Sequence, residues 1–289
     1  MRRFWVALAI FAAVAAVAWL GICRPYTLPM GGMEPTLYRG DKVLVVKRWC
    51  DRRLRRGDVV VYDAPIGGDG TGRAAATEQC VARVAAMPGD TIHLDSAMCL
   101  TDGDGRRLPY RRMLYAYDSR YDTAVTAMLR RHDFGLCELL GYSGDDFVRA
   151  LTGDEAHFLR LANPDGLGIR PMHTPQPGRC ATVVIPAKGQ RIDVTPGNMH
   201  LLCQALRRYE DCAAEIAGGR LIVDGREAKA LIFGRDYYWL QSENVMDIND
   251  SRLCGLMPRE ALDGRVAVTL FSHSPSQGVR WRRIFSPVQ

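Results

Sequence analysis

An uncharged apolar segment at residues 4–23 restricts what this chain can become. Its 20 residues are rich in alanine and have arginines on both sides. At about 1.5 Å per residue such a segment spans the hydrocarbon core of a bilayer as a helix. Trp5 and Trp19, near its two ends, suit the membrane interfaces. The pattern predicts a membrane anchor over residues 1–24, and the alternative is a cleavable signal peptide ending near Ala16–Ala18.

Composition excludes several classes of protein. With 24% charged and 47% hydrophobic residues, the chain is ordinary for a globular protein. A net charge of +6 is too small to indicate nucleic acid as a partner. Nine cysteines show no C-x-x-C pair and six histidines show no H-x-x-x-H spacing, so no metal or cofactor is predicted. An extracytoplasmic location would permit a disulfide, and the sequence leaves that open.

The body of the chain predicts a mainly β fold. Short β-branched runs, two of them entered through Gly-Asp, predict strands at 41–47, 58–62, 81–94 and 266–271. Residues 220–233 predict a hairpin whose turn is Asp224-Gly225. Helical spacing predicts helices at 121–131, 144–152 and 198–210, and a Pro- and Gly-rich stretch predicts a loop at 163–178.

These patterns divide the chain into four parts. After the anchor, residues 25–95 form the first part of a β core. Residues 96–215 form a mixed α/β insertion. Residues 216–289 form a hairpin and the return to the core.

The stretch from Pro29 to Leu37, followed by Gly40-Asp41, carries the strongest functional signal. It resembles the Pro-Ser-x-Ser-Met-x-Pro-Thr-Leu box of the bacterial type I signal peptidases, a serine–lysine protease family. Three further boxes follow in the family's order, at Arg56–Val60, Ala82–Asp90 and Ser242–Gly255. The resemblance implies a signal-peptidase β core with an inserted β/α second domain, tethered by one N-terminal transmembrane helix. It also implies a soluble part on the extracytoplasmic side of the cytoplasmic membrane.

The positions that carry chemistry in this family have lost the required groups. The nucleophilic serine falls on Gly32 and the general-base lysine on Ala82. The oxyanion-side serine falls on Met30, and the serine that supports the lysine falls on Ile248. Glycine has no nucleophile and alanine accepts no proton. Loss of such a unit in a serine protease lowers turnover on the order of 10⁶-fold, so no catalytic residue is intact and a pseudoprotease is predicted.

The residues that build turns and strand entries in the family pattern are retained. They are Met33, Pro35, Thr36, Gly40, Asp41, Gly57, Asp58, Arg83, Pro88, Gly89, Asp90, Asp250, Ser251, Arg252 and Gly255. A polar network that joins Asp250 to Arg252 near the cleft is expected. The fold should therefore persist without the reaction.

Three functions stay open. The favoured one is a non-catalytic protein that binds signal peptides or preproteins by strand addition, or that regulates an active signal peptidase. The second is a working endopeptidase with a relocated nucleophile, for which Cys80, on the same strand face as Ala82, is the candidate. The third is a membrane-tethered scaffold. The basic run Lys47–Arg56 suggests contact with anionic lipid headgroups. The alternative is that it is only a solvated connection between two strands.

Overall fold

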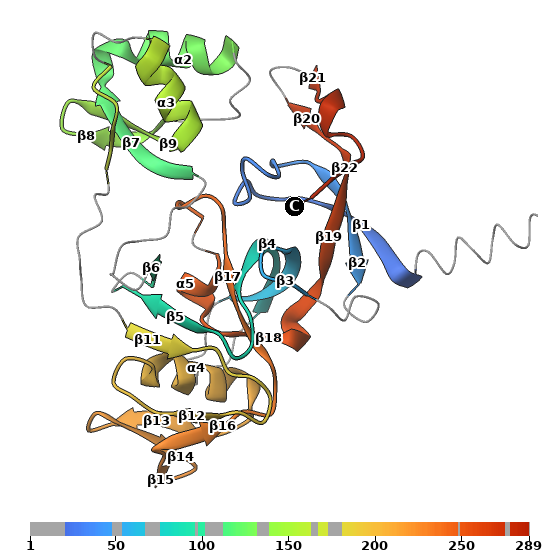
Figure 1. Ribbon diagram of the computed structural model, residues 1–289, viewed down its shortest axis with the longest axis vertical. Coiled ribbons are helices and arrows are strands. Elements are labelled where there is room, and N and C mark those ends of the chain that lie inside the picture. Colours follow the sequence, from blue (N-terminus) through green and yellow to red (C-terminus); the bar gives the residue numbers. More distant parts are fainter. Residues whose placement is uncertain are drawn as a thin grey trace, which may run out of the picture.

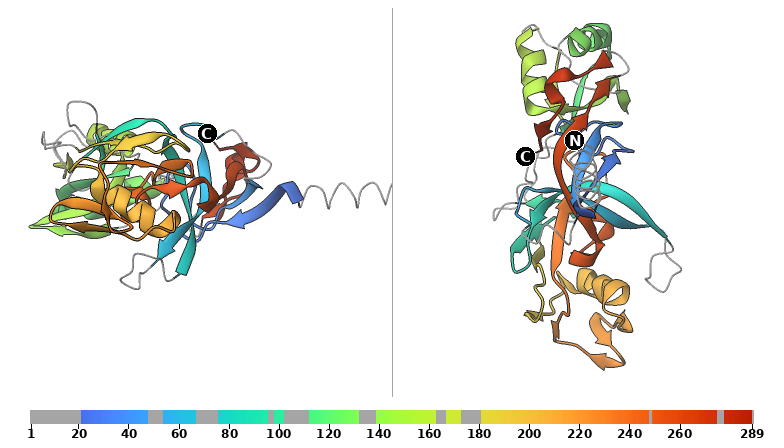
Figure 2. Two further views of the ribbon diagram at one scale, coloured as in Figure 1. Left: turned by 90° about the horizontal axis from the view of Figure 1, so that it is seen from below. Right: turned by 90° about the vertical axis from the view of Figure 1, so that its right-hand side faces the viewer.

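The structure, a computed structural model, describes residues 21–47, 54–66, 76–95, 98–101, 112–131, 139–162, 167–172, 181–247, 249–274 and 278–288. Strands predominate, as predicted. A central β core lies between two smaller lobes, residues 112–172 at the top of Figure 1 and residues 191–235 at its bottom. The two lobes lie at opposite ends of the long axis in both Figure 1 and the right-hand view of Figure 2.

The core is one large antiparallel sheet in the order β1-β2-β19-β3-β4-β17-β18, with β22 paired to β19. Its strands are β1 (Cys23–Thr27), β2 (Lys42–Lys47), β3 (Val59–Ile66), β4 (Ala76–Ala86), β17 (Tyr237–Gln241), β18 (Met257–Pro258), β19 (Leu262–Phe271) and β22 (Ser286–Pro287). The strands predicted at 41–47, 58–62, 81–94 and 266–271 are confirmed. The C-terminal strands complete a sheet that the N-terminal strands begin, so the fold joins the two ends of the sequence.

Both faces of this sheet are buried. Val59 and Val61 of β3 belong to one apolar cluster, whereas Val60 and Tyr62 belong to another. Successive side chains of a strand point to opposite faces, which explains why β3 is a continuous apolar run instead of an alternating one.

Glycine turns lead into several strands. Gly40, Gly57 and Gly89 have positive φ angles of 85°, 94° and 87°, a region that glycine enters without steric cost. The aspartate after each glycine accepts a hydrogen bond from the backbone N–H three residues earlier, as Asp90 does from Met87 at 2.6 Å. The Gly-Asp pairs of the sequence therefore act as strand entries.

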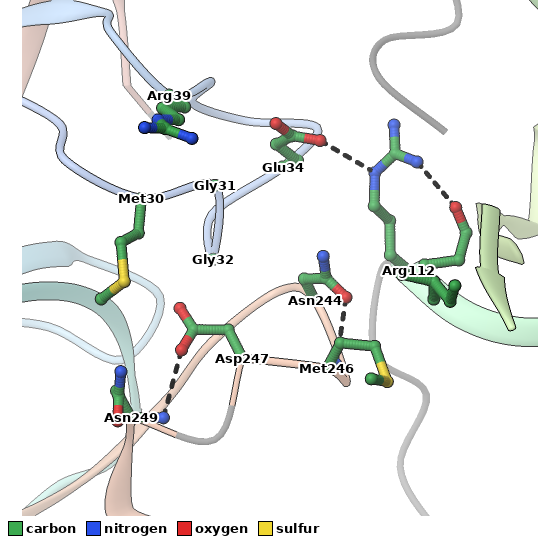
Figure 3. A pocket seen from close by; sticks show the side chains of 12 residues that line it. Met30, Gly31, Gly32, Glu34, Arg39, Arg112, Asn244, Met246, Asp247 and Asn249 are labelled. Atoms are coloured by element: carbon green, nitrogen blue, oxygen red, sulfur yellow. Dashed lines mark hydrogen bonds and ion pairs between the residues drawn. The ribbon is translucent and has the colours of Figure 1, made fainter. Parts of the chain in front are cut away.

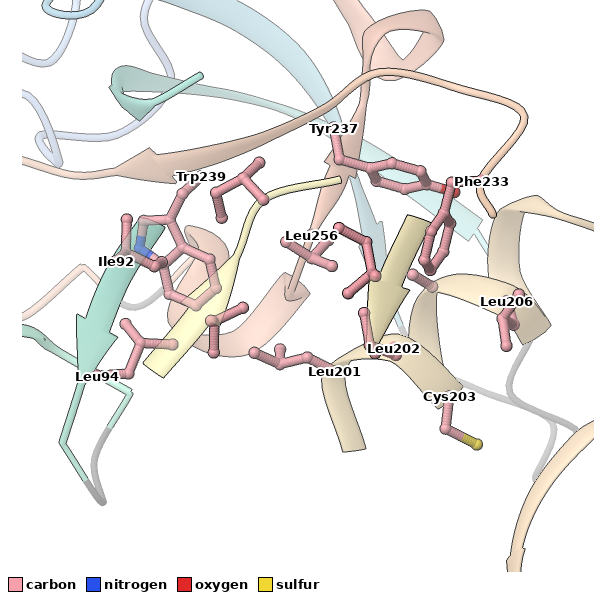
Figure 4. Close-up of a cluster of buried hydrophobic side chains, with 14 of the residues drawn as sticks. Ile92, Leu94, Leu201, Leu202, Cys203, Leu206, Phe233, Tyr237, Trp239 and Leu256 are labelled. Carbon is pink, nitrogen blue, oxygen red and sulfur yellow. The ribbon is translucent and has the colours of Figure 1, made fainter. Parts of the chain in front are cut away.

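The lower lobe packs around α4 (Met199–Tyr209), which confirms the helix predicted at 198–210. Its strands are β12 (Arg191–Asp193), β13 (Ala214–Ala217), β14 (Arg220–Val223), β15 (Arg226–Glu227) and β16 (Ala230–Ile232). The hairpin predicted at 220–233 is confirmed, with positive φ at Asp224 and Gly225. Leu202 and Leu206 of α4 belong to one apolar cluster with Trp239, Tyr237 and residues of a small sheet of β5 (Thr91–Leu94), β6 (Leu100–Thr101) and β11 (Ala181–Val184), and Figure 4 shows part of this cluster.

The upper lobe is a four-stranded sheet in the order β10-β7-β9-β8, with two helices. Its elements are β7 (Arg112–Asp118), η1 (Ser119–Tyr121), α2 (Asp122–Arg131), β8 (Leu139–Ser143), β9 (Asp146–Thr152), α3 (Gly153–Ala162) and β10 (Arg170–Pro171). The helix predicted at 121–131 is confirmed as α2. The helix predicted at 144–152 is wrong: β9 is a strand between β7 and β8. Its pairing on both sides outweighs the helix propensity of Arg149, Ala150 and Leu151.

Five short elements finish the chain around the core. They are α5 (Ser251–Cys254), η2 (Arg259–Ala261), the pair β20 (His273–Ser274) and β21 (Gly278–Val279), and η3 (Trp281–Arg283). Of the loop predicted at 163–178, residues 167–172 are described, and they include β10.

The predicted anchor falls almost wholly outside the described residues. Its last two residues, Cys23 and Arg24, begin β1 and pair with Val46 and Val45 of β2. In the part of the chain that the structure describes, no helix is long and apolar enough to span a bilayer. Cys80, Cys203, Cys212 and Cys254 are free thiols.

Candidate functional site

The resemblance to signal peptidases directs attention to the motif loop, residues 28–38, which connects β1 to β2. Leu28 ties its start to the next strand, because its N–H donates to the Asp41 carbonyl at 3.0 Å and its carbonyl accepts from Gly40 N–H at 2.9 Å. Met33 and Leu37 are buried in the apolar cluster beneath β2 and β3. The loop is therefore closed at its base and fixed by two apolar side chains.

Gly32, the family nucleophile position, lies buried against the segment that carries the fourth family box. Its carbonyl oxygen accepts hydrogen bonds from the backbone N–H groups of Glu243 at 2.9 Å and Asn244 at 3.0 Å. A Cβ atom built on Gly32 would lie 1.6 Å from Oδ2 of Asp247. The Asp247 carboxylate thus occupies the space that a serine side chain would need, as Figure 3 shows.

A side chain on Gly31 would also meet a carboxylate, but at a longer distance. A Cβ atom on it would lie 2.8 Å from Oε1 of Glu34. The Gly31-Gly32 pair is therefore bordered by two carboxylates, and the absence of side chains is what permits this close approach.

Asp247 was not among the residues singled out from the sequence. Its Oδ1 accepts from Asn249 N–H at 3.1 Å, and its own N–H donates to the Asn244 carbonyl at 3.1 Å. Burial raises the pKa of the Asp247 carboxyl, and the neighbouring Asp250 charge raises it further. The available sequence signal was an acid where the family box has asparagine, three residues before Asp250.

Ala82, the general-base position, is fully buried in β4 and pairs with Val60 of β3. Its cluster is apolar and also contains Val84 and Leu240, with Met30 packed against it. The base position and the oxyanion-side position therefore both contribute to hydrophobic packing. No described basic group replaces the lysine inside this cluster. Ile248 lies outside the described residues.

Cys80 shares the Ala82 face of β4, as the strand period predicted, since both belong to the same buried cluster. Its side chain is almost completely buried. Burial, and then the charge of Glu78, raise the pKa of the thiol to about 12. A thiol with such a pKa holds almost no thiolate near neutral pH, and thiolate is the nucleophilic form.

A first polar network joins all four boxes. Glu243 is buried and forms an ion pair with Arg83, whose Nε donates to Oε1 at 3.0 Å. The Thr36 hydroxyl donates to the same oxygen at 2.9 Å, and Arg83 also donates to the Gly57 carbonyl. Charge-assisted bonds of this kind position the motif loop against β4.

A second network surrounds Asp250 and contains the expected contact with Arg252, at 2.9 Å from Nε to Oδ1. Asp250 also accepts from Ser242 N–H at 2.9 Å, and Arg252 donates to the carbonyls of Val245 at 2.8 Å and of Asp247. This network determines the course of the chain through residues 242–252 and thereby places Asp247 opposite Gly32.

A third network links the motif loop to the C-terminal tail. Asp41 is fully buried and accepts from the Ser272 hydroxyl at 2.6 Å and from Arg283 at 3.1 Å. The guanidinium of Arg280 lies 4.0 Å from the centroid of the Tyr38 ring, a cation–π distance.

A pocket of about 440 Å³ opens between the motif loop and the upper lobe (Figure 3). It is lined by Met30, Gly31, Gly32, Glu34, Arg39, Arg112, Leu140, Ala150, Asn244, Met246, Asp247 and Asn249. A second, narrower cavity lies between the motif loop and β4, where Gly32 and Asp247 meet Cys80 and Val81. Asp247 lines both cavities.

Arg112 joins the upper lobe to this pocket. Its side chain is 1% exposed and lies between two buried carboxylates, with Nε 3.7 Å from Glu34 and Nη2 3.1 Å from Glu155. Its backbone pairs with the segment opposite Gly32, donating to the Glu243 carbonyl at 2.9 Å and accepting from Val245 N–H at 3.1 Å. The insertion is thus tied directly to the site.

The described residues hold no group of three histidine, cysteine or carboxylate side chains that could bind a metal ion. They bring Met30, Gly32 and the retained scaffold together, with Asp247 added. Catalysis by the family's route needs a hydroxyl nucleophile and a base, and this arrangement provides neither at the two matching positions.

Comparison with known proteins agrees with the residue patterns. The family model described as "Signal peptidase, peptidase S26" matches residues 1–133, which include the first three boxes. A comparison with curated proteins finds no match. The fourth box lies beyond the matched residues, and the structure brings it to the first box through Gly32, Glu243 and Asn244. Over residues 1–133 the chain is thus similar to the signal peptidase family, peptidase S26.

Proposed function

We propose that this protein is a catalytically inactive signal peptidase-like protein that binds an extended peptide, a signal peptide or preprotein segment, without cutting it. One observation carries the proposal: the Asp247 carboxylate stands 1.6 Å from where a side chain on Gly32 would begin. The family's attacking group has been lost, and its space has also been filled.

We place such a peptide along the edge of β4, leading to the pocket of about 440 Å³ beside Gly32, because the cavity between the motif loop and β4 measures only about 10 Å³. β4 pairs with β3 from Ala76 to Arg83, but with β17 only from Arg83 to Ala86. The preceding part of β4 has no strand partner on that side among the described residues, although the Tyr26 hydroxyl donates to the Gln79 carbonyl at 3.1 Å. An extended peptide added there would run toward Asp247 and Gly32.

A relocated nucleophile is the competing function. Cys80 is its candidate, and it lies in the right cavity. Its burial and its pKa of about 12 oppose that role, because neighbouring carboxylates raise a thiol pKa whereas activation requires a cation. The retained networks fit either a peptide-binding protein or a membrane scaffold, and the pocket beside Gly32 favours binding.

We also propose that the apolar segment at residues 4–23 anchors the protein in the cytoplasmic membrane, with the β core on the extracytoplasmic side. Anionic lipid is then a partner, through the basic run Lys47–Arg56. An active signal peptidase is a second possible partner, whose access to preproteins this protein would regulate.

A cleavage assay tests the proposal. Purified full-length protein in detergent is incubated with a preprotein, and products are identified by mass spectrometry. We expect no product from the wild-type protein or from Cys80→Ser. Cleavage that disappears in Cys80→Ser would establish the competing function.

A gain-of-function variant sharpens this assay. Gly32→Ser with Ala82→Lys restores both reacting groups, but the new serine meets Asp247. Addition of Asp247→Asn restores the residue of the family pattern. We expect any recovered cleavage in the triple variant to exceed that in the double variant.

A further inference from the structure

Asp247 is a carboxylate in an unfavourable place. It lies against the bare Cα of Gly32, lines both cavities of the site and is largely shielded from water. Burying a carboxylate without a cation costs free energy, and a fold ordinarily avoids that cost by pairing the charge.

Burial raises the pKa of the Asp247 carboxyl, and the Asn249 N–H, the Arg252 guanidinium and the Ser242 hydroxyl lower it in part. Oδ1 of Asp247 accepts one backbone hydrogen bond, from Asn249. The nearby guanidinium of Arg252 is engaged by Asp250 at 2.9 Å, so these two form a pair without net charge. Oδ2 is the oxygen that faces Gly32.

The two arginines that line the larger pocket do not neutralise Asp247 either. Arg112 lies between Glu34 and Glu155, whose two charges exceed its own. Arg39 is exposed and forms no ion pair with any described residue. In Figure 3 the Gly31-Gly32 segment lies between Arg39 and Asp247.

We infer that Asp247 makes this site selective for a positively charged side chain, a lysine or arginine of the bound extended peptide. The inference rests on the proposed peptide-binding function. A long basic side chain reaches a recessed carboxylate while its methylene stem lies along apolar surface, which Met30 and Met246 provide in the pocket. The ammonium or guanidinium then gives Asp247 a direct cationic partner, through a charge-assisted hydrogen bond.

Peptide pairs that differ only in one charge test this. Fluorescent, N-acetylated decapeptides of extended apolar sequence carry a single lysine, placed at each position in turn, or norleucine in its place. Acetylation removes the terminal amine as an alternative cation. Affinities for full-length protein in detergent are measured by fluorescence polarisation. For at least one position we expect lysine to bind about tenfold or more tightly than norleucine.

Two variants identify the acid responsible. Asp247→Asn has nearly the same shape and should reduce the lysine-to-norleucine ratio to about one. Asp193→Asn makes the same charge change on an exposed side chain of β12 and should leave the ratio unchanged. Thermal unfolding of both variants verifies that they are folded.

The outcomes separate the inference from the function on which it rests. Equal binding of lysine and norleucine peptides by the wild-type protein would refute selectivity for a cation and leave peptide binding intact. A preference that survives in Asp247→Asn would refute the role of Asp247. Failure of every peptide to bind would refute the proposed function itself.

Discussion

Substitution of Gly32 by alanine tests the close approach of Asp247 to the motif loop. The new Cβ atom would lie 1.6 Å from Oδ2, whereas real Cβ contacts are not shorter than 3.0 Å. The carboxylate must therefore move by at least about 1.4 Å. That shift strains the hydrogen bond from Asn249 N–H and the tight contact with Gly32.

Overpacking of this kind costs about 1–3 kcal/mol. For a protein of this size we expect the melting temperature to fall by about 2–4 °C per kcal/mol. Gly31→Ala is a graded comparison, because its 2.8 Å contact is with the end of the Glu34 side chain and needs a much smaller shift. It should cost less than Gly32→Ala.

A double-mutant cycle isolates the contact. Asp247→Ala removes the carboxylate, so Gly32→Ala should cost much less in that background, with a coupling energy of about 1–2 kcal/mol. Differential scanning fluorimetry of the full-length protein in detergent gives all four melting temperatures. Equal effects of Gly32→Ala in both backgrounds would show that Asp247 does not fill the nucleophile position.

Three further predictions follow from the same contacts. Burial raises the folded-state pKa of Asp247, so ionisation of this group destabilises the fold as pH rises through that pKa. Asp247→Asn should therefore raise the melting temperature at pH 8 and change it little at pH 3.5. Equal gains at both pH values would contradict this. Arg112→Met removes the guanidinium that lies between the buried carboxylates of Glu34 and Glu155; we expect a loss of about 3–5 kcal/mol and faster hydrogen exchange in the motif loop, whereas unchanged exchange would mean that the upper lobe does not restrain that loop. Cys80, with its pKa of about 12, should react with iodoacetamide at pH 8 far more slowly than an unfolded control, and rapid labelling in mass spectra would argue for an accessible nucleophile.

The strands of the core could be predicted because their signals are local. Two β-branched runs entered through Gly-Asp gave correct positions, since positive φ at Gly40 and Gly57 requires glycine and the apolar runs are buried on both faces. The hairpin at Asp224-Gly225 was predictable for the same reason.

The helix predicted at 144–152 is wrong because pairing with a strand distant in the sequence determines the secondary structure of this segment. Phe147 to Thr152 pairs along its length with β7, about thirty residues earlier in the chain. Helical spacing alone did not distinguish this strand from a helix, as is common for short apolar runs.

The site was only partly predictable. The family boxes pointed to Met30, Gly32 and Ala82; in the structure Met30 packs against the cluster that contains Ala82 and lines one cavity together with Gly32. Asp247 escaped notice because its importance depends on a contact between residues more than two hundred positions apart. The glycine at position 32 suggested the loss of a serine side chain, and the structure adds that the Asp247 carboxylate lies where that side chain would be.

Photo-crosslinking of an intact signal peptide tests the central claim most directly. A synthetic signal peptide with benzoylphenylalanine at successive positions is irradiated with the full-length protein, and the adducts are mapped by mass spectrometry. We predict adducts on the motif loop or on β4 that carry the full mass of the peptide, which would demonstrate binding without cleavage. Adducts that carry only a fragment cut at a single bond, or cut peptide free in solution, would show an active peptidase and contradict the account.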